Sequence, residues 1–137
     1  MQTFLDLGTL ASLLLAVGLG GVVGIEREKT HKPAGLRTHM MVCLGACLYT
    51  IISIHFSTTP SQIAAGIVAG IGFIGAGTIW AEKDKVQGIT TAASLWATAA
   101  VGLATGIGDY ALAAVTTLLV LIILISRHLF IRLGIEH

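Results

Sequence analysis

Residues 26–38, Glu-Arg-Glu-Lys-Thr-His-Lys-Pro-Ala-Gly-Leu-Arg-Thr, form the only long polar run in a chain built mainly from small and aliphatic residues. The run holds four of the eight Lys and Arg residues and two of the seven acids. The whole chain of 137 residues is 55% hydrophobic and 11% charged, with a mean hydropathy of +0.90. Soluble domains carry about 25% charged residues. The composition therefore predicts an integral membrane protein, in which the polar run is a loop, a site, or both.

Apolar stretches lie on both sides of this run, and at about 17 to 22 residues each is long enough to cross a bilayer as a helix. We therefore predict a single domain, residues 1–137, that is an all-α bundle of five transmembrane helices. The predicted spans are about residues 5–25, 38–56, 62–81, 90–107 and 110–126. Small residues on most sides of 90–107 predict a helix surrounded by other helices, and the Leu, Ile and Val of 110–126 predict a lipid-facing helix.

The positions of the basic residues predict the orientation. With five spans, the 26–38 loop, the 82–88 loop and the C-terminus lie on one side, and that side holds every Lys and Arg of the chain. The positive-inside rule then places these segments in the cytoplasm and the N-terminus outside. An arrangement with four spans, in which 88–108 is re-entrant, would move Arg127 and Arg132 outside and weaken this asymmetry.

Capping residues mark the expected helix ends. Asp6 meets the positive end of the first helix dipole, and Thr38 is the predicted N-cap of the second helix. Thr59 predicts a capping box at the start of the third helix. Gly108 and Asp109 predict a short turn, in which Gly ends the fourth helix and Asp caps the fifth.

Glycine pairs predict where helices approach each other closely. Gly20 and Gly24 form a GxxxG step, as do Gly102 and Gly106, and such steps let two helix backbones touch. Five glycines in the third span predict packing as well, because each costs about 1 kcal/mol relative to Ala in a helix. The alternative is a helix break near 72–77 that frees backbone groups to line a cavity. The predicted helix-packing residues are Gly20, Gly24, Gly66, Gly70, Gly72, Gly75, Gly77, Trp96, Gly102 and Gly106.

Glu26 and Glu28 lie at a helix exit, where a carboxylate meets the negative end of the dipole and is disfavoured. In one interpretation, one or both turn inward, to Arg37 or to a bound cation, which makes them speculative metal ligands. In the other, they belong to a solvated cluster of pairs worth about 0–1 kcal/mol. Hydroxyls at two helix starts could bind an anion or act only as caps. The predicted polar cytoplasmic site, which would bind a partner, is Glu26, Arg27, Glu28, Arg37, Thr38, Thr90, Thr91 and Ser94.

Several functions lack support in the residues. We predict no enzyme, no cofactor, no confident metal site and no nucleic-acid partner. Cys43 and Cys47 share one helix face and are expected to pack between helices. Asp6, His55 and Asp109 could meet around a metal on the outer side, but they show no ligand spacing. No ionisable group lies near the middle of a span, which argues against a self-contained ion pump but not against a channel lined by carbonyls and hydroxyls.

Four motifs in this order resemble the membrane domain of the MgtC/SapB family: GGVVGIERE at 20–28, KPAGLRTH at 32–39, IAAGIVAGIGFIGAG at 63–77 and VQGITTAASLWA at 86–97. The resemblance covers about residues 10–125, and it implies a multi-pass protein of a bacterial-type cytoplasmic (inner) membrane. The matching family positions are Glu26, Arg27, Glu28, Gly35, Leu36, Arg37, Thr38, Gly72, Gly75, Gly77, Thr90, Thr91, Ser94 and Trp96.

The resemblance also implies a function. Members are linked to magnesium homeostasis, to growth at low magnesium and, in pathogens, to virulence inside macrophages. It implies action by restraining the ATP synthase and contacting other membrane proteins, rather than by carrying magnesium. We therefore expect a regulatory or interaction module, with a homo-oligomer compatible with its glycine faces. The alternative is a small transporter or channel for Mg²⁺ or another ion. Longer members carry a C-terminal soluble domain, which we do not expect in this sequence. Functions of that domain are therefore not expected here.

Overall fold

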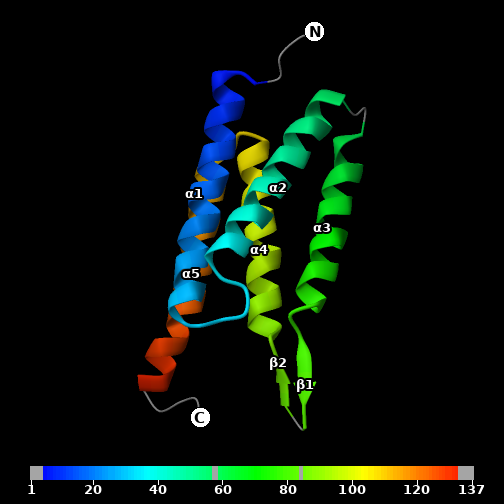
Figure 1. Cartoon of the computed structure of the whole chain (residues 1–137). Helices are drawn as coiled ribbons and strands as arrows, with labels where there is room; N and C mark the ends of the chain where they lie inside the picture. Colours follow the sequence, from blue (N-terminus) through cyan, green and yellow to red (C-terminus); the bar gives the residue numbers. More distant parts are fainter. Residues whose placement is uncertain (1–4, 57–58, 84, 133–137) are drawn as a thin grey trace.

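The computed structural model describes residues 5–56, 59–83 and 85–132, and it is mainly helical (Figure 1). These residues form five helices and one pair of short antiparallel strands. The elements are α1 (Leu7–Lys29), α2 (Leu36–Phe56), α3 (Pro60–Ala76), β1 (Trp80–Glu82), β2 (Lys85–Gln87), α4 (Ile89–Gly106) and α5 (Tyr110–Arg132). The predicted bundle of five helices is confirmed, whereas the strand pair was not predicted.

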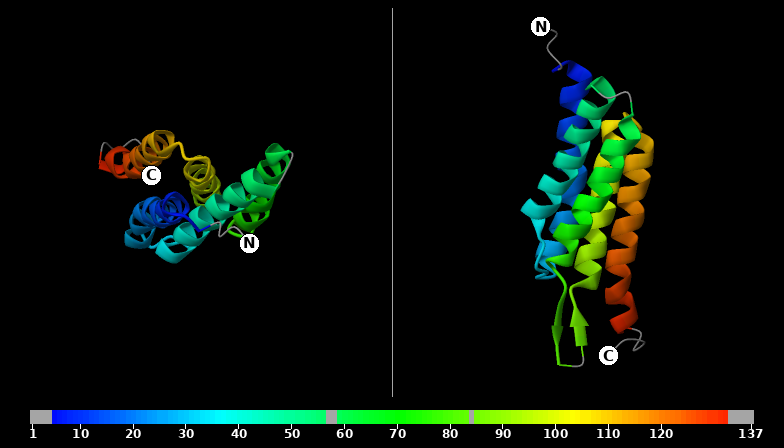
Figure 2. Two further views of the ribbon diagram at one scale, coloured as in Figure 1. Left: turned by 90° about the horizontal axis from the view of Figure 1, so that it is seen from above. Right: turned by 90° about the vertical axis from the view of Figure 1, so that its right-hand side faces the viewer.

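Helix α4 is the centre of the bundle, because it contacts all four other helices. The most extensive contacts join α1 to α2 and α2 to α4, while α3 lies at one edge against α4 and α2. Helix α5 packs on α4 and α1 and leaves most of its Leu, Ile and Val side chains exposed. The view from above shows this arrangement (Figure 2). The prediction that 90–107 is surrounded by other helices is thus confirmed except on the side that carries Trp96.

Three of the described helices, α1, α2 and α4, are long and apolar enough to cross a membrane. The remaining apolar helical stretches, Pro60–Ala76 and Tyr110–Ser126, are shorter. The 17 residues of α3 span about 25 Å, compared with about 30 Å for a hydrocarbon core.

Helix α2 is held between two glycine pairs. A Cβ on Gly20 of α1 would lie 2.6 Å from the His39 carbonyl oxygen, and one on Gly24 would lie 2.7 Å from the Leu36 Cα. On the other side, a Cβ on Gly102 of α4 would collide with the Cys43 carbonyl, and one on Gly106 would lie 2.7 Å from the Cys47 carbonyl oxygen. The close approaches expected at both GxxxG steps are therefore present, and α2 is the helix that both steps contact.

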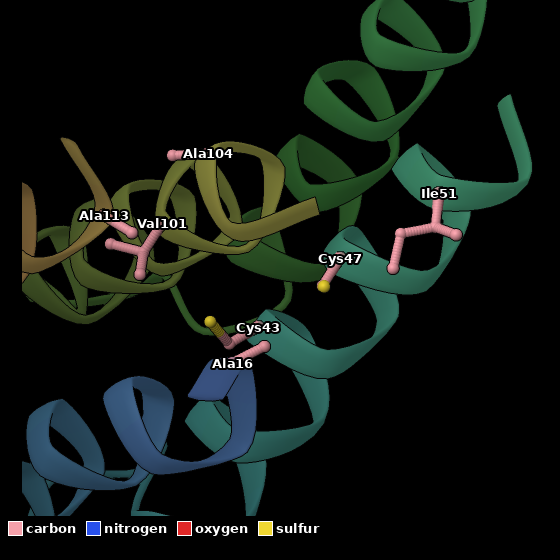
Figure 3. Close-up of a cluster of buried hydrophobic side chains, with 7 residues drawn as sticks. All are labelled: Ala16, Cys43, Cys47, Ile51, Val101, Ala104 and Ala113. Atoms are coloured by element: carbon pink, nitrogen blue, oxygen red, sulfur yellow. The ribbon is translucent and has the colours of Figure 1, made fainter. Parts of the chain in front are cut away.

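The interior between these helices is filled by small side chains. Cys43 and Cys47 are both buried as free thiols. They pack in one apolar cluster with Ala16, Ile51 and Val101 (Figure 3). The expectation that the two cysteines pack between helices is confirmed.

The glycines of α3 do not pack as expected. Gly66, Gly70 and Gly72 have no described atom within 4 Å of where a Cβ would lie, whereas Gly75 packs on Ala92 at 3.4 Å. Helix α3 meets α4 and α2 closely only along part of its surface, and these three glycines lie outside the close contacts. The prediction that Gly66, Gly70 and Gly72 pack against other helices is therefore wrong for the described chain.

Two further packing predictions need correction. Trp96 is 54% exposed, because it lies on the side of α4 that no other helix covers. Gly77 does not pack against another helix. It is the C-cap of α3, and its amide donates a hydrogen bond to the Phe73 carbonyl. Helix α3 runs unbroken through Gly72 and ends at Ala76. The predicted alternative of a break at 72–77 therefore corresponds only to the C-terminal end of this helix.

The helix boundaries differ from the predictions at several ends. Helix α2 begins at Leu36, so Thr38 lies within its first turn and is not the N-cap. Helix α3 was expected to reach residue 81 but ends at Ala76. Helix α1 was expected to end at residue 25 but continues to Lys29.

A β-hairpin replaces the predicted end of the third helix. Thr78 leaves α3 with both its amide and its hydroxyl donating to the Gly75 carbonyl, at 2.9 and 2.7 Å. Strands β1 and β2 then pair, with Trp80 opposite Gln87. Gly88 closes the hairpin at φ +88°, and a Cβ there would collide with the Thr78 carbonyl. Ile79, Trp80 and Val86 are the β-favouring residue types that outweigh helix continuation here.

The predicted caps are confirmed at two helices. Asp6 accepts a hydrogen bond from the Thr9 amide at 2.7 Å, and this bond holds the pKa of the Asp6 carboxyl below its ordinary value. Asp109 accepts from the Leu112 amide at 2.9 Å, after Gly108 at φ +82°. Thr59 occupies the N-cap of α3, but its side chain makes no capping hydrogen bond, so a capping box is not formed. The adjoining residues 57 and 58 lie outside the described residues.

We predict that Gly20→Ala lowers the free energy of unfolding by about 1–3 kcal/mol, because the added methyl group would overpack the contact with α2. Gly18→Ala is the matched control on the same helix, since nothing lies within 4 Å of its Cβ position. Thermal unfolding in detergent measures both variants. Equal destabilisation of the two would show that the close approach of α1 and α2 does not limit stability.

Candidate functional site

Arg27 is the buried charge of the bundle, with 3% of its surface exposed. It lies one turn beyond Gly24 on the face of α1 that meets α2 and α4. Its Nη2 donates a hydrogen bond to Thr91 Oγ1 of α4 at 3.0 Å. A guanidinium thus bridges two helices that are far apart in the sequence.

Glu26 turns inward beside Arg27. Its side chain is 11% exposed, and its Oε2 lies 3.8 Å from Arg27 Nη1. Oε2 accepts no hydrogen bond from the residues that the structure describes. The interpretation as a solvated cluster is therefore wrong for Glu26. The inward interpretation holds, with Arg27 and not Arg37 as the partner, because Arg37 is exposed at the start of α2.

Glu28 is held at the start of another helix. Its Oε2 accepts the Leu36 amide at 2.9 Å, at the N-terminus of α2. A side chain at Gly35 would collide with this carboxylate. The acid is disfavoured at the end of α1 but favoured at the positive end of the α2 dipole. Glu28 is therefore the cap that was expected from Thr38.

His39 connects α2 to α4. Its Nδ1 lies 2.9 Å from the Gly35 carbonyl oxygen, and its Nε2 lies 3.1 Å from Ser94 Oγ. Because a carbonyl only accepts, Nδ1 carries a hydrogen. Ser94 also donates to the Thr91 carbonyl at 2.8 Å. Its single hydroxyl hydrogen serves either that carbonyl or Nε2, so both bonds form together only when Nε2 is protonated and donates to Ser94 Oγ.

The structure therefore brings together only part of the predicted site. We name Glu26, Arg27, His39, Thr91 and Ser94 the polar cluster; it joins α1, α2 and α4 at the end of the bundle from which the hairpin projects (Figure 1). The other predicted residues lie outside it. Glu28 caps α2, Arg37 and Thr90 are exposed, and Thr38 is half-buried on α2.

His39 was missed in the sequence, and Arg27 was included in the polar site without a prediction of where its side chain points. A helical signal for both was present. His39 lies four residues before Cys43 and eight before Cys47, on the face expected to pack. Arg27 lies three residues after Gly24 and seven after Gly20, on the glycine face. Extending each predicted packing face by one turn reaches the polar cluster.

The opposite end of the bundle holds a second polar region. Asp6, Ser12 and His55 help to line a cavity of about 270 Å³. Ser12 Oγ and the Tyr110 hydroxyl are hydrogen-bonded at 2.8 Å across α1 and α5. Asp109 does not line this cavity and caps α5 instead. In the described part of the chain, no three His, Cys, Asp or Glu residues are grouped as metal ligands would be.

The fold and the site together define a bundle of apolar helices that shields an ion pair at one end, and three of these helices are long and apolar enough to cross a membrane. The chain belongs to the MgtC family, whose sequence model matches residues 13–132.

Named relatives agree with this assignment. The chain is 44% identical over 115 residues to "Protein MgtC" of Brucella abortus (strain 2308), covering 82% of this chain and 48% of the relative. It is 43% identical over 122 residues to "Putative magnesium transporter YhiD" of Escherichia coli (strain K12), covering 80% and 57%. The chain spans about half the length of these relatives. No solved structure matches it.

A double-mutant cycle should reveal the ion pair. Arg27→Gln leaves the Glu26 carboxylate buried without its counter-charge, and we expect a loss of about 3–5 kcal/mol in the free energy of unfolding. Glu26→Gln in the same background should cost less than it does alone, with a coupling energy of about 0.5–3 kcal/mol. Chemical unfolding in detergent provides the values.

The matched control for this cycle is Glu26→Gln combined with Arg37→Gln. Arg37 is exposed and forms no ion pair among the described residues, so these two changes should add. Coupling of Glu26 to Arg37 with additivity to Arg27 would contradict the observed geometry.

Neighbouring threonines allow a second test. Thr91→Val removes the hydroxyl that accepts from Arg27 and keeps the side-chain shape, and we expect a loss of about 1.5–3 kcal/mol for a hydrogen bond to a charged group. Thr90→Val is the control, because Thr90 is exposed one residue earlier on the same helix. Thermal unfolding compares the two variants, and equal melting temperatures would refute a role for the Arg27–Thr91 bond.

Proposed function

We propose that this protein is a regulatory or interaction module of the MgtC type in a bacterial cytoplasmic membrane, linked to magnesium limitation or stress survival. In this proposal it acts by contacting another membrane protein, with the ATP synthase as the partner that the family resemblance suggests. The observation that carries the proposal is the closed polar interior. The buried hydroxyls of the described chain, together with Arg27 and His39, form hydrogen bonds between or within its own helices.

The hydroxyls within the bundle support this proposal over a conducting pore. Thr50, Thr98, Thr105 and Thr117 each donate to the carbonyl four residues earlier in their own helix, at 2.7–2.8 Å. These four side chains are all buried. A channel lined by hydroxyls would need such groups to face a water-filled path. Their oxygens are instead directed to their own backbone, and the glycine contacts on α2 close the space between α1, α2 and α4.

We further propose five spans, with the N-terminus outside and the C-terminus in the cytoplasm. Supporting this, Lys29, Arg37, Lys83 and Lys85 lie at one end of the bundle, with the hairpin projecting beyond the helices (Figure 1). This is the asymmetry that the positive-inside rule requires. In this topology the exposed hairpin and the polar cluster both face the cytoplasm, where a partner could contact them.

A transporter or channel for Mg²⁺ remains the second candidate. One relative, that of Escherichia coli, carries the name of a putative magnesium transporter. Glu26 supports this candidate too, because its Oε2 accepts no hydrogen bond from the described residues. In a transporter, this carboxylate would be a transient cation ligand and Arg27 the competing charge.

Reconstitution separates the two candidates. We expect purified protein in liposomes that contain a magnesium-sensitive dye to pass no more Mg²⁺ than protein-free liposomes, because the polar interior is closed. The same protein should restore growth at low magnesium to a strain that lacks it, which shows that the preparation is functional. An ionophore added at the end of each run verifies that the vesicles are sealed.

The opposite result would establish the transporter. A Mg²⁺ flux that is strong in the wild type, lost in Glu26→Gln and kept in Glu82→Gln would overturn the regulatory proposal. Glu82 is the matched control because it is an exposed acid of the hairpin.

A further inference from the structure

A long groove separates α2 from α3. Its volume is about 1000 Å³, and its walls are mainly apolar side chains of these two helices. The helices meet near the turn that joins them and diverge toward the end of the bundle that holds Arg37 (Figures 1 and 2). The groove is therefore tapered, with its wide mouth at that end.

Three glycines keep the walls of this groove flat. Gly45 of α2 and Gly66 and Gly70 of α3 line it, and nothing described lies within 4 Å of any of their Cβ positions. These glycines differ from those of α1 and α4, which press against α2. Their lack of side chains provides space and not a helix contact.

The mouth of the groove carries an uncompensated positive charge. Among the described residues, Arg37 is the only charged one that lines the groove, and Thr38 lies beside it. Arg37 is exposed and forms no ion pair with an acid of the described chain. Glu28, which lies near the same helix start, is already occupied by the Leu36 amide. A guanidinium in this state matches a phosphate group.

The groove is long enough to hold an acyl chain. On α2 its lining runs from Arg37 to Tyr49, which is about 18 Å along a helix. Half of a hydrocarbon core is about 15 Å. An acyl chain of one leaflet that enters at Arg37 would thus fit within the groove, whose far end is lined by Gln62 near the start of α3.

We propose that this groove binds one anionic phospholipid, with its phosphate on Arg37 and Thr38 and an acyl chain along Gly45, Gly66 and Gly70. A transmembrane helix of about 10 Å diameter fits the tapered end poorly, because α2 and α3 converge there, and it offers no anion to Arg37. A lipid satisfies both the charge and the shape. The proposal rests on the membrane placement above and not on the regulatory role.

Native mass spectrometry of the full chain, freed of lipid in detergent and titrated with phosphatidylglycerol, tests the proposal. We expect one phosphatidylglycerol to remain bound to the wild type. Gly66→Leu and Gly70→Leu should abolish this binding, because the new side chains fill the groove. Arg37→Gln should weaken it about tenfold, as expected for loss of a charge-assisted hydrogen bond. Diacylglycerol, which lacks the phosphate, should bind the wild type as weakly as phosphatidylglycerol binds Arg37→Gln.

Matched controls lie close to each variant. Gly72→Leu adds the same side chain to α3 at an exposed position that does not line the groove, and Lys29→Gln removes a charge at the same end of the bundle. Both should keep wild-type binding, and melting temperatures verify that all variants are folded.

Two results would overturn the proposal. Equal lipid retention in Gly66→Leu, Gly72→Leu and the wild type would show only non-specific lipid around the bundle. A dimer that Gly70→Leu dissociates, without any retained lipid, would show that a second copy of the chain occupies the groove.

Discussion

The close approach of α1 and α4 to α2 is the constraint on which the rest of this bundle depends. Gly20 and Gly24 remove side chains from one side of α2, and Gly102 and Gly106 remove them from the other. At these contacts, atoms of the α2 backbone occupy the space that a Cβ would need. Membrane helices associate through such contacts, because lipid provides no hydrophobic force between them. The bundle is thus a three-helix core, to which α3 and α5 are added at the edges.

This close packing makes the polar cluster possible. Thr91 and Ser94 have short side chains, and they reach Arg27 and His39 only because the helix backbones nearly touch. A charge buried without such partners would cost several kcal/mol, so the hydroxyls and Glu26 offset the burial of the guanidinium. The cluster in turn specifies how the ends of the three helices are aligned. The structural and functional interpretations of these residues are therefore physically linked.

The chain belongs to the MgtC family, in which one relative is named a putative magnesium transporter, but the geometry supports contact with a partner more than conduction of an ion. The polar groups of the interior form hydrogen bonds to one another or to their own helices. The surface carries an exposed hairpin, glycines of α3 that contact no other helix, and an apolar groove with a basic mouth. Partner proteins and lipids recognise a surface of this kind, whereas an ion needs a path. A lipid held between α2 and α3 would also fix the position of α3, which has few contacts of its own.

The sequence by itself determined the membrane class, the number of helices, the central position of 90–107 and the two GxxxG contacts, because length, hydropathy and small-residue spacing are local properties. It also located the conflict at Glu26 and Glu28, where two acids end a helix. Only the tertiary structure decided how the conflict is resolved, with Glu26 beside Arg27 and Glu28 on the amides of α2. The outward position of the α3 glycines, the hairpin and the inward position of His39 were decided in the same way. The partner of a side chain depends on which helices become neighbours and at what rotation, and these quantities are set by the packing of the whole bundle.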